Sequence, residues 1–151
     1  MPRFSYYLRV RYSECDAQKV VFNARYGDYV DVAVAEYLRA LGYGKEMQTG
    51  ELDIQLVKQT IEWRGPAHYD EVLDISVAAK HMGNTSFTLL TEFRLVGSED
   101  VFVTAETVYV HVDTHTLTKM PLPQRLRDAF ARGAPGHVTD HAGYLKGAPP
   151  P

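Results

Sequence analysis

The spacing of apolar and polar positions predicts one long helix near the start of the chain. Between residues 26 and 41, apolar side chains recur at intervals of three and four, which is the period of a helix with one wide buried stripe. The apolar positions are Tyr26, Tyr29, Val30, Ala33, Val34, Tyr37, Leu38 and Leu41. Gly42 and Gly44 follow directly and are typical of a helix end.

Five further segments have the pattern of strands. Residues 4–12 precede the helix and are rich in aromatic and β-branched side chains, which favour a strand. Four more segments follow the helix, at residues 54–63, 71–81, 86–96 and 101–113. They are separated by Gly, Pro, Asn and Asp residues, which turns favour. The last segment is apolar on both faces, so we expect it to be a central strand of a sheet.

The rest of the chain divides into a short helix and a tail. The sequence PLPQRLRDAF at 121–130 predicts a helix, because Pro123 suits a first helical turn and the apolar residues recur at helical spacing. Residues 133–151 are dense in Gly, Pro and Ala, so we expect them to form a flexible tail. One domain is therefore expected over residues 1–132, which agrees with the chain length of 151 residues.

The order of these elements indicates an α+β fold in which an antiparallel sheet wraps around one long helix. That helix can cover one face of the sheet, and little else in the chain is left to cover the other face. We therefore expect pairing of subunits to bury the remaining surface, so that the protein forms a homo-oligomer.

Composition and charge exclude several classes of protein. The hydrophobic fraction of 45% and the charged fraction of 23% are close to the average for globular domains. The net charge is −3 and the basic residues are scattered, so nucleic acid is not an expected partner. No apolar run approaches the ~20 residues of a membrane-spanning helix, so no membrane association is expected. The single cysteine cannot form an intramolecular disulfide, which agrees with a cytoplasmic location.

The loop before the long helix holds the main candidate for chemistry. In the sequence ECDAQKVVFNARY at 14–26, Asp16 precedes a short apolar run and the expected start of the helix. One interpretation is a turn in which the carboxylate accepts hydrogen bonds from neighbouring backbone groups. The other is a half-buried acid beside the apolar residues at 20–22, which can serve as a nucleophile or a general base. The sequence leaves both interpretations open.

Asn23 stands where the helical spacing begins. Its side chain is expected to act as an N-cap that accepts a backbone N–H. The position also has a catalytic interpretation, because a helix start carries free N–H groups and a partial positive charge that can polarise a carbonyl. The two interpretations are compatible.

Cysteine and metal chemistry are not expected. Cys15 has no histidine within ten residues to remove its proton, so we expect a small packing residue. His111, Asp113 and His115 would share one face of an extended strand, as metal ligands can. However, Asp113 and Thr114 are more typical of a turn, and no other Cys or His pair has ligand spacing. We therefore expect no metal and no cofactor.

The segment at 9–38, RVRYSECDAQKVVFNARYGDYVDVAVAEYL, resembles the opening motif of the hotdog-fold acyl-CoA thioesterases. The most similar branch is the 4-hydroxybenzoyl-CoA thioesterase-like group, which includes the YbgC-type enzymes. The resemblance continues through IEWRGPAHYDEVLDISVAAKHMGNTSFTLLTEF and AETVYVHVDTHTLTKMPLPQRLR, and covers roughly residues 5–130. It implies a hotdog fold, in which an antiparallel sheet wraps around one long central helix.

The resemblance also implies two catalytic positions. Asp16 would be the catalytic carboxylate, which either attacks the thioester carbonyl or activates water. The backbone N–H of Asn23 would face the thioester oxygen. Members of the family commonly have His or Tyr at this position, so a backbone role is the one that this chain can share with them.

Further residues are implied for binding coenzyme A. The turn MGNTSF would help to hold it, with Thr85 and Ser86 as the polar side chains. Some members carry basic residues in this turn, whereas this chain has a neutral one. Arg64 or Lys80 would then be the contact to the nucleotide phosphates.

The function implied by the resemblance is hydrolysis of an acyl-CoA thioester to a free acid and coenzyme A. The active site would cross a subunit boundary in a dimer or a homotetramer. Phe22, Tyr26 and Tyr29 would either shape an acyl pocket or belong to the core. Two other functions stay open: a hotdog hydratase that acts on acyl thioesters, and a non-catalytic protein that binds acyl-CoA or acyl-carrier protein.

Overall fold

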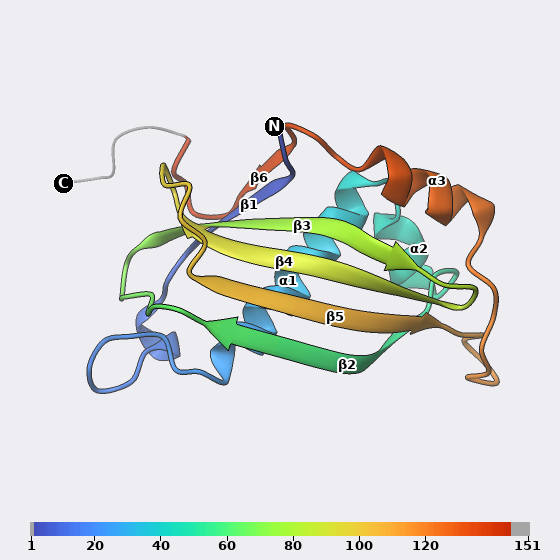
Figure 1. The fold of residues 1–151 in the computed structure, drawn as a ribbon, viewed down its shortest axis with the longest axis horizontal. Coiled ribbons are helices and arrows are strands. Elements are labelled where there is room, and N and C mark those ends of the chain that lie inside the picture. The colour runs from blue at the N-terminus through green and yellow to red at the C-terminus, as the bar shows by residue number, and fades with distance from the viewer. Residues whose placement is uncertain (1, 146–151) are drawn as a thin grey trace.

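The computed structural model describes residues 2–145 and contains the elements expected from the sequence (Figure 1). The helices in this part are α1 (Arg25–Ala40), α2 (Gly44–Thr49) and α3 (Gln124–Arg132). The strands are β1 (Ser5–Arg9), β2 (Ile54–Trp63), β3 (Val72–Met82), β4 (Ser86–Leu95), β5 (Val103–His111) and β6 (Val138–Asp140). The predicted strands and both predicted helices are confirmed, whereas α2 and β6 have no counterpart among the predicted elements. No helix within residues 2–145 is long and apolar enough to cross a membrane.

The strands form one sheet in the order β2-β5-β4-β3-β1-β6. Neighbouring strands are antiparallel, except that β6 runs parallel to β1. Strand β5 lies between β2 and β4, which confirms the interior position expected for residues 101–113. Strands β2 and β6 are the two edges within residues 2–145, so one side of each has backbone N–H and C=O groups that face no strand of this chain.

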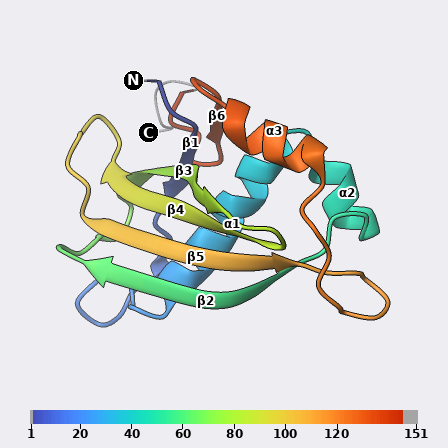
Figure 2. The same cartoon turned by 45° about the vertical axis from the view of Figure 1, so that its right-hand side comes forward.

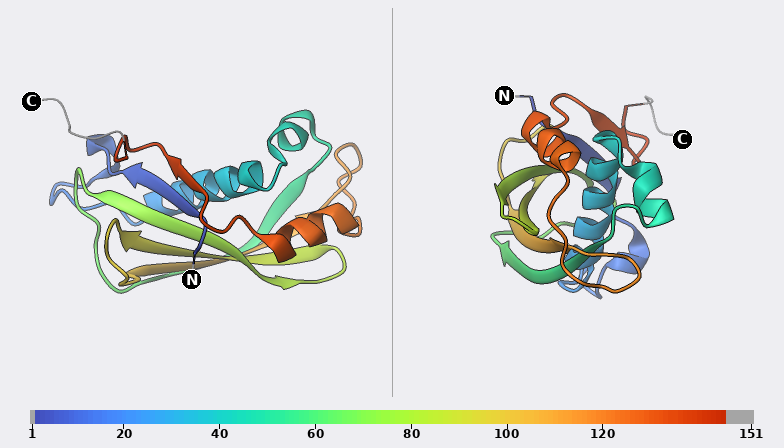
Figure 3. Two further views of the ribbon diagram at one scale, coloured as in Figure 1. Left: turned by 90° about the horizontal axis from the view of Figure 1, so that it is seen from above. Right: turned by 90° about the vertical axis from the view of Figure 1, so that its right-hand side faces the viewer.

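Helix α1 lies along the inner face of the curved sheet (Figures 2 and 3). All eight positions of the predicted apolar stripe are buried. The rings of Tyr26 and Tyr29 contact Phe93 of β4, with centroids 5.5 and 6.5 Å away, and Tyr37 stacks on Phe130 of α3. Burial of a large apolar side chain contributes about 1.5–3 kcal/mol, so this packing fixes the position of α1. The α+β arrangement is confirmed.

Part of the segment expected as a flexible tail, residues 133–151, belongs to the sheet. Strand β6 pairs with β1, and the N–H of His141 donates to the C=O of Tyr7 at 3.0 Å. The Nδ1 atom of His141 also lies 3.0 Å from the hydroxyl of Tyr6. The prediction is therefore wrong for this stretch, because backbone pairing at a sheet edge leaves little signal in composition. Residues 146–151 of the predicted tail lie outside the described residues.

Candidate active site

The loop between β1 and α1 folds as a small hairpin with Asp16 at its tip. Cys15 and Val21 pair as an antiparallel bridge. Beyond this bridge, the N–H of Asp16 donates to the C=O of Val20 at 2.9 Å, and the N–H of Lys19 donates to the C=O of Asp16 at 2.9 Å. Lys19 adopts a left-handed conformation with φ of 62°, which closes the tight turn. The backbone thus fixes where Asp16 stands.

The side chain of Asp16 is exposed within the single chain. Its Oδ1 atom accepts hydrogen bonds from the N–H groups of Gln18 at 2.8 Å and Val20 at 3.4 Å. This is the turn expected in the first interpretation, and that interpretation is confirmed. Half-burial of the acid is wrong for the single chain, because Val21 is the one fully buried residue of the run 20–22 and Asp16 itself is exposed. The Oδ2 atom accepts none of the hydrogen bonds found among residues 2–145, so this oxygen is left without a donor there.

Asn23 lies at the start of α1, but not as its cap. The first helical residue is Arg25, the cap position is Ala24, and no side chain caps the helix. The predicted N-cap role of Asn23 is therefore wrong, because the helix begins one residue too late for it. The C=O of Asn23 accepts from the N–H of Tyr26 at 3.3 Å. Its own N–H takes part in none of the hydrogen bonds among the described residues and is free to donate.

A cavity of about 390 Å³ brings Asn23 together with Arg64. The other residues that line it are Val20, Val21, Tyr26, Trp63, Gly65 and Pro66. Two contacts fix its shape: the N–H of Val21 donates to the C=O of Ala67 at 2.9 Å, and the N–H of Arg64 donates to the C=O of Phe102 at 2.8 Å. Asp16 lies on the same loop but does not line this cavity.

The residues expected to hold coenzyme A are divided between two ends of the molecule. Thr85 lies in the turn between β3 and β4, and Ser86 is the first residue of β4; this turn is at the opposite end of the sheet from the start of α1 (Figure 1). The C=O of Thr85 accepts from the N–H of His111 at 2.8 Å, which ties this turn to the far end of β5. Lys80 pairs with Glu106 at 3.0 Å. Of these residues expected to hold coenzyme A, Arg64 is the one that lines a cavity with Asn23 of the same chain.

The aromatic residues near the loop separate into core and surface. Tyr26 and Tyr29 are each 1% exposed and belong to the core, although Tyr26 also lines the cavity beside Asn23. Phe22 is 56% exposed on the loop. Of the three, Phe22 is the side chain that remains available for contact with another molecule.

Cys15 is a protonated thiol rather than a nucleophile. Partial burial, followed by the nearby charges of Glu14 and Asp16, raises its pKa above the ordinary value for cysteine. Its Sγ atom lies 3.6 Å from the C=O of Arg11, to which it donates. This agrees with a packing role, because a thiol becomes reactive only where neighbouring groups lower its pKa.

The histidine pattern near the end of β5 forms a turn. Asp113 accepts from the N–H groups of His115 and Thr116, both at 2.9 Å, so Asp113 begins a turn as expected. His111 is buried, with Nδ1 3.1 Å from the C=O of Pro121. Across residues 2–145, no three His, Cys, Asp or Glu side chains gather closely enough to hold a metal ion.

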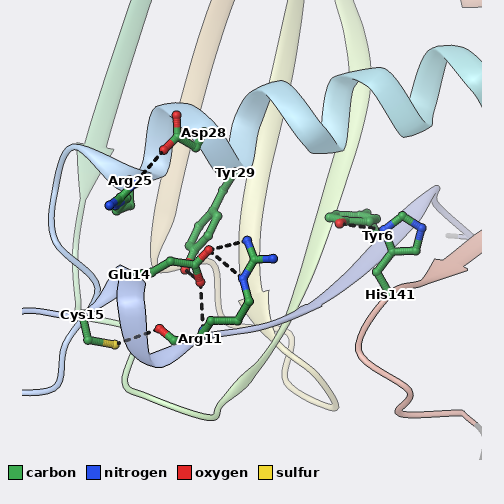
Figure 4. Close-up of polar contacts among 8 residues, drawn as sticks. All are labelled: Tyr6, Arg11, Glu14, Cys15, Arg25, Asp28, Tyr29 and His141. Atoms are coloured by element: carbon green, nitrogen blue, oxygen red, sulfur yellow. Dashed lines mark hydrogen bonds and ion pairs between the residues drawn. The ribbon is translucent and has the colours of Figure 1, made fainter.

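A second carboxylate on the loop, Glu14, is not among the predicted site residues, although its partner Arg11 stands only three residues before it. It is buried, and four donors surround it (Figure 4). Its Oε1 atom accepts from the N–H of Arg11 and from the hydroxyl of Tyr29, each at 2.8 Å. Its Oε2 atom accepts from the Nε and Nη2 atoms of Arg11. Because Tyr29 follows Glu14 by fifteen residues, no local spacing predicts the contact.

These donors keep Glu14 charged. Burial by itself would raise the pKa of Glu14, but the hydrogen bonds from Arg11 and Tyr29 outweigh it and hold the pKa below the ordinary value. Conversely, burial and the bond to Glu14 raise the pKa of Tyr29, so its hydroxyl stays protonated and acts as a donor. Glu14 is therefore an ionised anchor between the loop and α1.

Solved structures identify the fold of this chain. The chain matches the crystal structure of a 1,4-dihydroxy-2-naphthoyl-CoA thioesterase from Synechocystis with a TM-score of 0.75. The match has 22% identity and covers 85% of this chain and 95% of that chain. The fold is thus the hotdog fold, as expected. A family model described as the thioesterase-like superfamily matches residues 10–130, so the chain belongs to that superfamily.

Relatives in the same superfamily are similar over most of their length. The acyl-CoA thioester hydrolase YbgC of Escherichia coli is 30% identical over 129 residues, which is 84% of this chain and 95% of that protein. The 1,4-dihydroxy-2-naphthoyl-CoA hydrolase of Synechococcus elongatus is 26% identical over 124 residues, which is 79% of this chain and 88% of that protein. The resemblance noted in the sequence is confirmed.

The anchor at Glu14 predicts a specific dependence of stability on pH. A carboxyl whose pKa is lowered by folding stabilises the protein above its ordinary pKa of 4.5 and loses this contribution as the pH falls through the lower folded value. The free energy of unfolding of wild type, measured by urea denaturation, should fall more steeply below about pH 4.5 than that of Glu14→Gln. Glu99→Gln, at a carboxylate 82% exposed, should follow wild type. Equal slopes for wild type and Glu14→Gln would contradict a lowered pKa of Glu14 in the folded protein.

Proposed function

We propose that this protein hydrolyses acyl-CoA thioesters, with Asp16 as the catalytic carboxylate and the backbone N–H of Asn23 as the donor to the thioester oxygen. The observation that carries the proposal is the pair of open groups on one loop, the Oδ2 atom of Asp16 and the N–H of Asn23, in a chain of the thioesterase-like superfamily. The names of two relatives, a thioester hydrolase and a naphthoyl-CoA hydrolase, support the same reaction.

The chemistry needs few groups. Asp16 either takes a proton from a water molecule whose oxygen attacks the carbonyl carbon, or attacks that carbon itself and is later released by water. The N–H of Asn23 stabilises the negative charge that develops on the carbonyl oxygen. When the tetrahedral intermediate collapses, the C–S bond breaks and coenzyme A leaves as a thiolate that takes up a proton. No metal or cofactor is required by this route.

We further propose that a second copy of the chain completes the site by pairing along β2. This strand is an open edge with apolar side chains on its surface: Leu56 is 43% exposed, Val57 58% and Trp63 45%. An open edge of this kind is a template for pairing with another strand. Two identical edges related by a two-fold axis pair antiparallel, so that the Trp63 end of one strand lies beside the Ile54 end of the other.

This pairing accounts for the separation of the candidate coenzyme A residues. Within one chain, Thr85 and Ser86 lie at the end of the sheet where β2 begins, far from Asn23 (Figure 1). Antiparallel pairing would bring the same turn of a second copy to the end that carries Asp16 and Asn23. We propose that Arg64 of one chain and Thr85 and Ser86 of the other contact coenzyme A. A dimer is sufficient for this site, and the homotetramer and the cytoplasmic location stay predictions.

Replacement of Asp16 tests the chemistry. Asp16→Asn should lower kcat by about a thousandfold, because the amide can neither attack nor accept a proton from water. The measurement is thiol release from short, long and aromatic acyl-CoAs, with circular dichroism to check that the fold persists. Asp28→Asn, at an exposed acid in the first turn of α1, should retain activity. Retained turnover in folded Asp16→Asn would contradict the proposal, and so would hydration of an enoyl-CoA by wild type without thiol release.

Two substitutions at Asn23 separate its backbone from its side chain. Asn23→Ala keeps the N–H and should stay within about fivefold of wild type, because the side chain makes no cap and no described hydrogen bond. Asn23→Pro removes the N–H and should lower kcat by at least about a hundredfold, as loss of one oxyanion donor does. Thiol release and the urea unfolding midpoint are measured for both. Equal activity of two folded variants would rule out the backbone donor.

A charge on the β2 edge tests the second copy. Val57→Glu should give a mass by light scattering near the 17.0 kDa of one chain, together with loss of thiol release, because a charge would be buried in the apolar edge between the two copies. Val138→Glu places the same change on the other edge strand, where Val138 is 39% exposed, and should change neither property. A Val57→Glu variant that keeps the mass and activity of wild type would refute pairing along β2.

A further inference from the structure

Glu14 stands at the base of the hairpin that carries both proposed catalytic groups. It precedes Asp16 by two residues, and its C=O accepts from the N–H of Phe22 at 3.0 Å. Phe22 is the neighbour of Asn23 in the chain. One residue therefore joins the two ends of the hairpin, so that a displacement of Glu14 moves Asp16 and Asn23 relative to each other.

The side chain of Glu14 fastens this base to the rigid core. Its carboxylate accepts from the hydroxyl of Tyr29, at 2.8 Å, and from Arg11. Tyr29 is 1% exposed in α1, and its ring packs against those of Tyr26 and Phe93. The hydroxyl of Tyr29 is thus held by the same packing that holds the helix, and it contacts the loop through Glu14 (Figure 4).

A hydrogen-bonded carboxylate suits this task better than an apolar contact. Glu14 is 7% exposed and receives four hydrogen bonds from three directions, which fixes its orientation as well as its depth. An amide at this position would present an NH₂ group to the Arg11 guanidinium or to the Tyr29 hydroxyl, so at least one donor would lose its acceptor. The geometry of the loop therefore depends on the charge of Glu14 and on the Tyr29 hydroxyl.

We propose that Glu14, held by the Tyr29 hydroxyl and Arg11, is a positioning residue that sets the distance between the carboxylate of Asp16 and the N–H of Asn23. The inference rests on the function proposed above. A misplacement of about 1 Å in reacting groups can cost about a hundredfold in rate, so a positioning role acts mainly on kcat. A purely structural role would lower the unfolding midpoint and leave the kcat of the folded protein unchanged.

The variant Tyr29→Phe tests this role by removing a single oxygen atom. We expect kcat for thiol release to fall by at least about tenfold, with KM within about threefold of wild type. Tyr37→Phe is the matched control, because Tyr37 is buried on the same helix and lines a cavity with Ala79, away from the loop. Tyr37→Phe should keep the kcat of wild type. Unchanged kcat in folded Tyr29→Phe would overturn the proposal.

A second measurement does not depend on the reaction. Amide hydrogen exchange over residues 15–23 should be at least about tenfold faster in Tyr29→Phe than in wild type or Tyr37→Phe, because the base of the hairpin is released. Unchanged exchange would overturn the proposal that Glu14 and Tyr29 anchor the loop, whatever the activity measurements show. If wild type released no thiol from any acyl-CoA, or if Asp16→Asn stayed active, the proposed function would fail, while the exchange result would still decide whether Glu14 and Tyr29 fix the loop.

Discussion

The packing of the apolar stripe of α1 against the inner face of the sheet is the contact on which the rest of the structure depends. It fixes the axis of the helix and therefore the point at which the chain leaves the β1–α1 loop. Tyr29 belongs to this stripe, and it also reaches out of the core to donate to Glu14. The same helix thus stabilises the fold through its rings and orders the loop through one hydroxyl.

A single chain leaves part of its sheet uncovered. Helix α1 covers the inner face of the sheet, while β2 is left as an open edge with Val57 and Trp63 on its surface. The cavity beside Asn23 and the exposed side chain of Phe22 lie at the same end of this edge strand as Trp63. An acid that is exposed in one chain can become enclosed when a second chain covers it. This is why the exposure of Asp16 in a single chain is compatible with a catalytic role.

The sequence predicts the features that depend on local spacing. The stripe of α1, the five predicted strands β1 to β5 and the turn at Asp113 follow from periodicity and from residues with strong turn preferences. Features that depend on distant partners are missed. Strand β6 exists because its backbone pairs with β1, and Glu14 is tied to the core by Tyr29, which lies fifteen residues further along the chain. The cap of α1 is misplaced by one residue, since Asn23 has the composition of a cap but Ala24 occupies the cap position.

The loop carries two acids two residues apart, and their surroundings argue for different tasks. A general base or nucleophile needs a lone pair that is free to meet a substrate or a water molecule. Both oxygens of Glu14 are occupied by donors from Arg11 and Tyr29, and the side chain is buried. Asp16 gives one oxygen to the turn and keeps the other open. Because the bonds that make Glu14 a firm anchor are the ones that would prevent it from reacting, Asp16 is the acid of this loop that remains suited to chemistry.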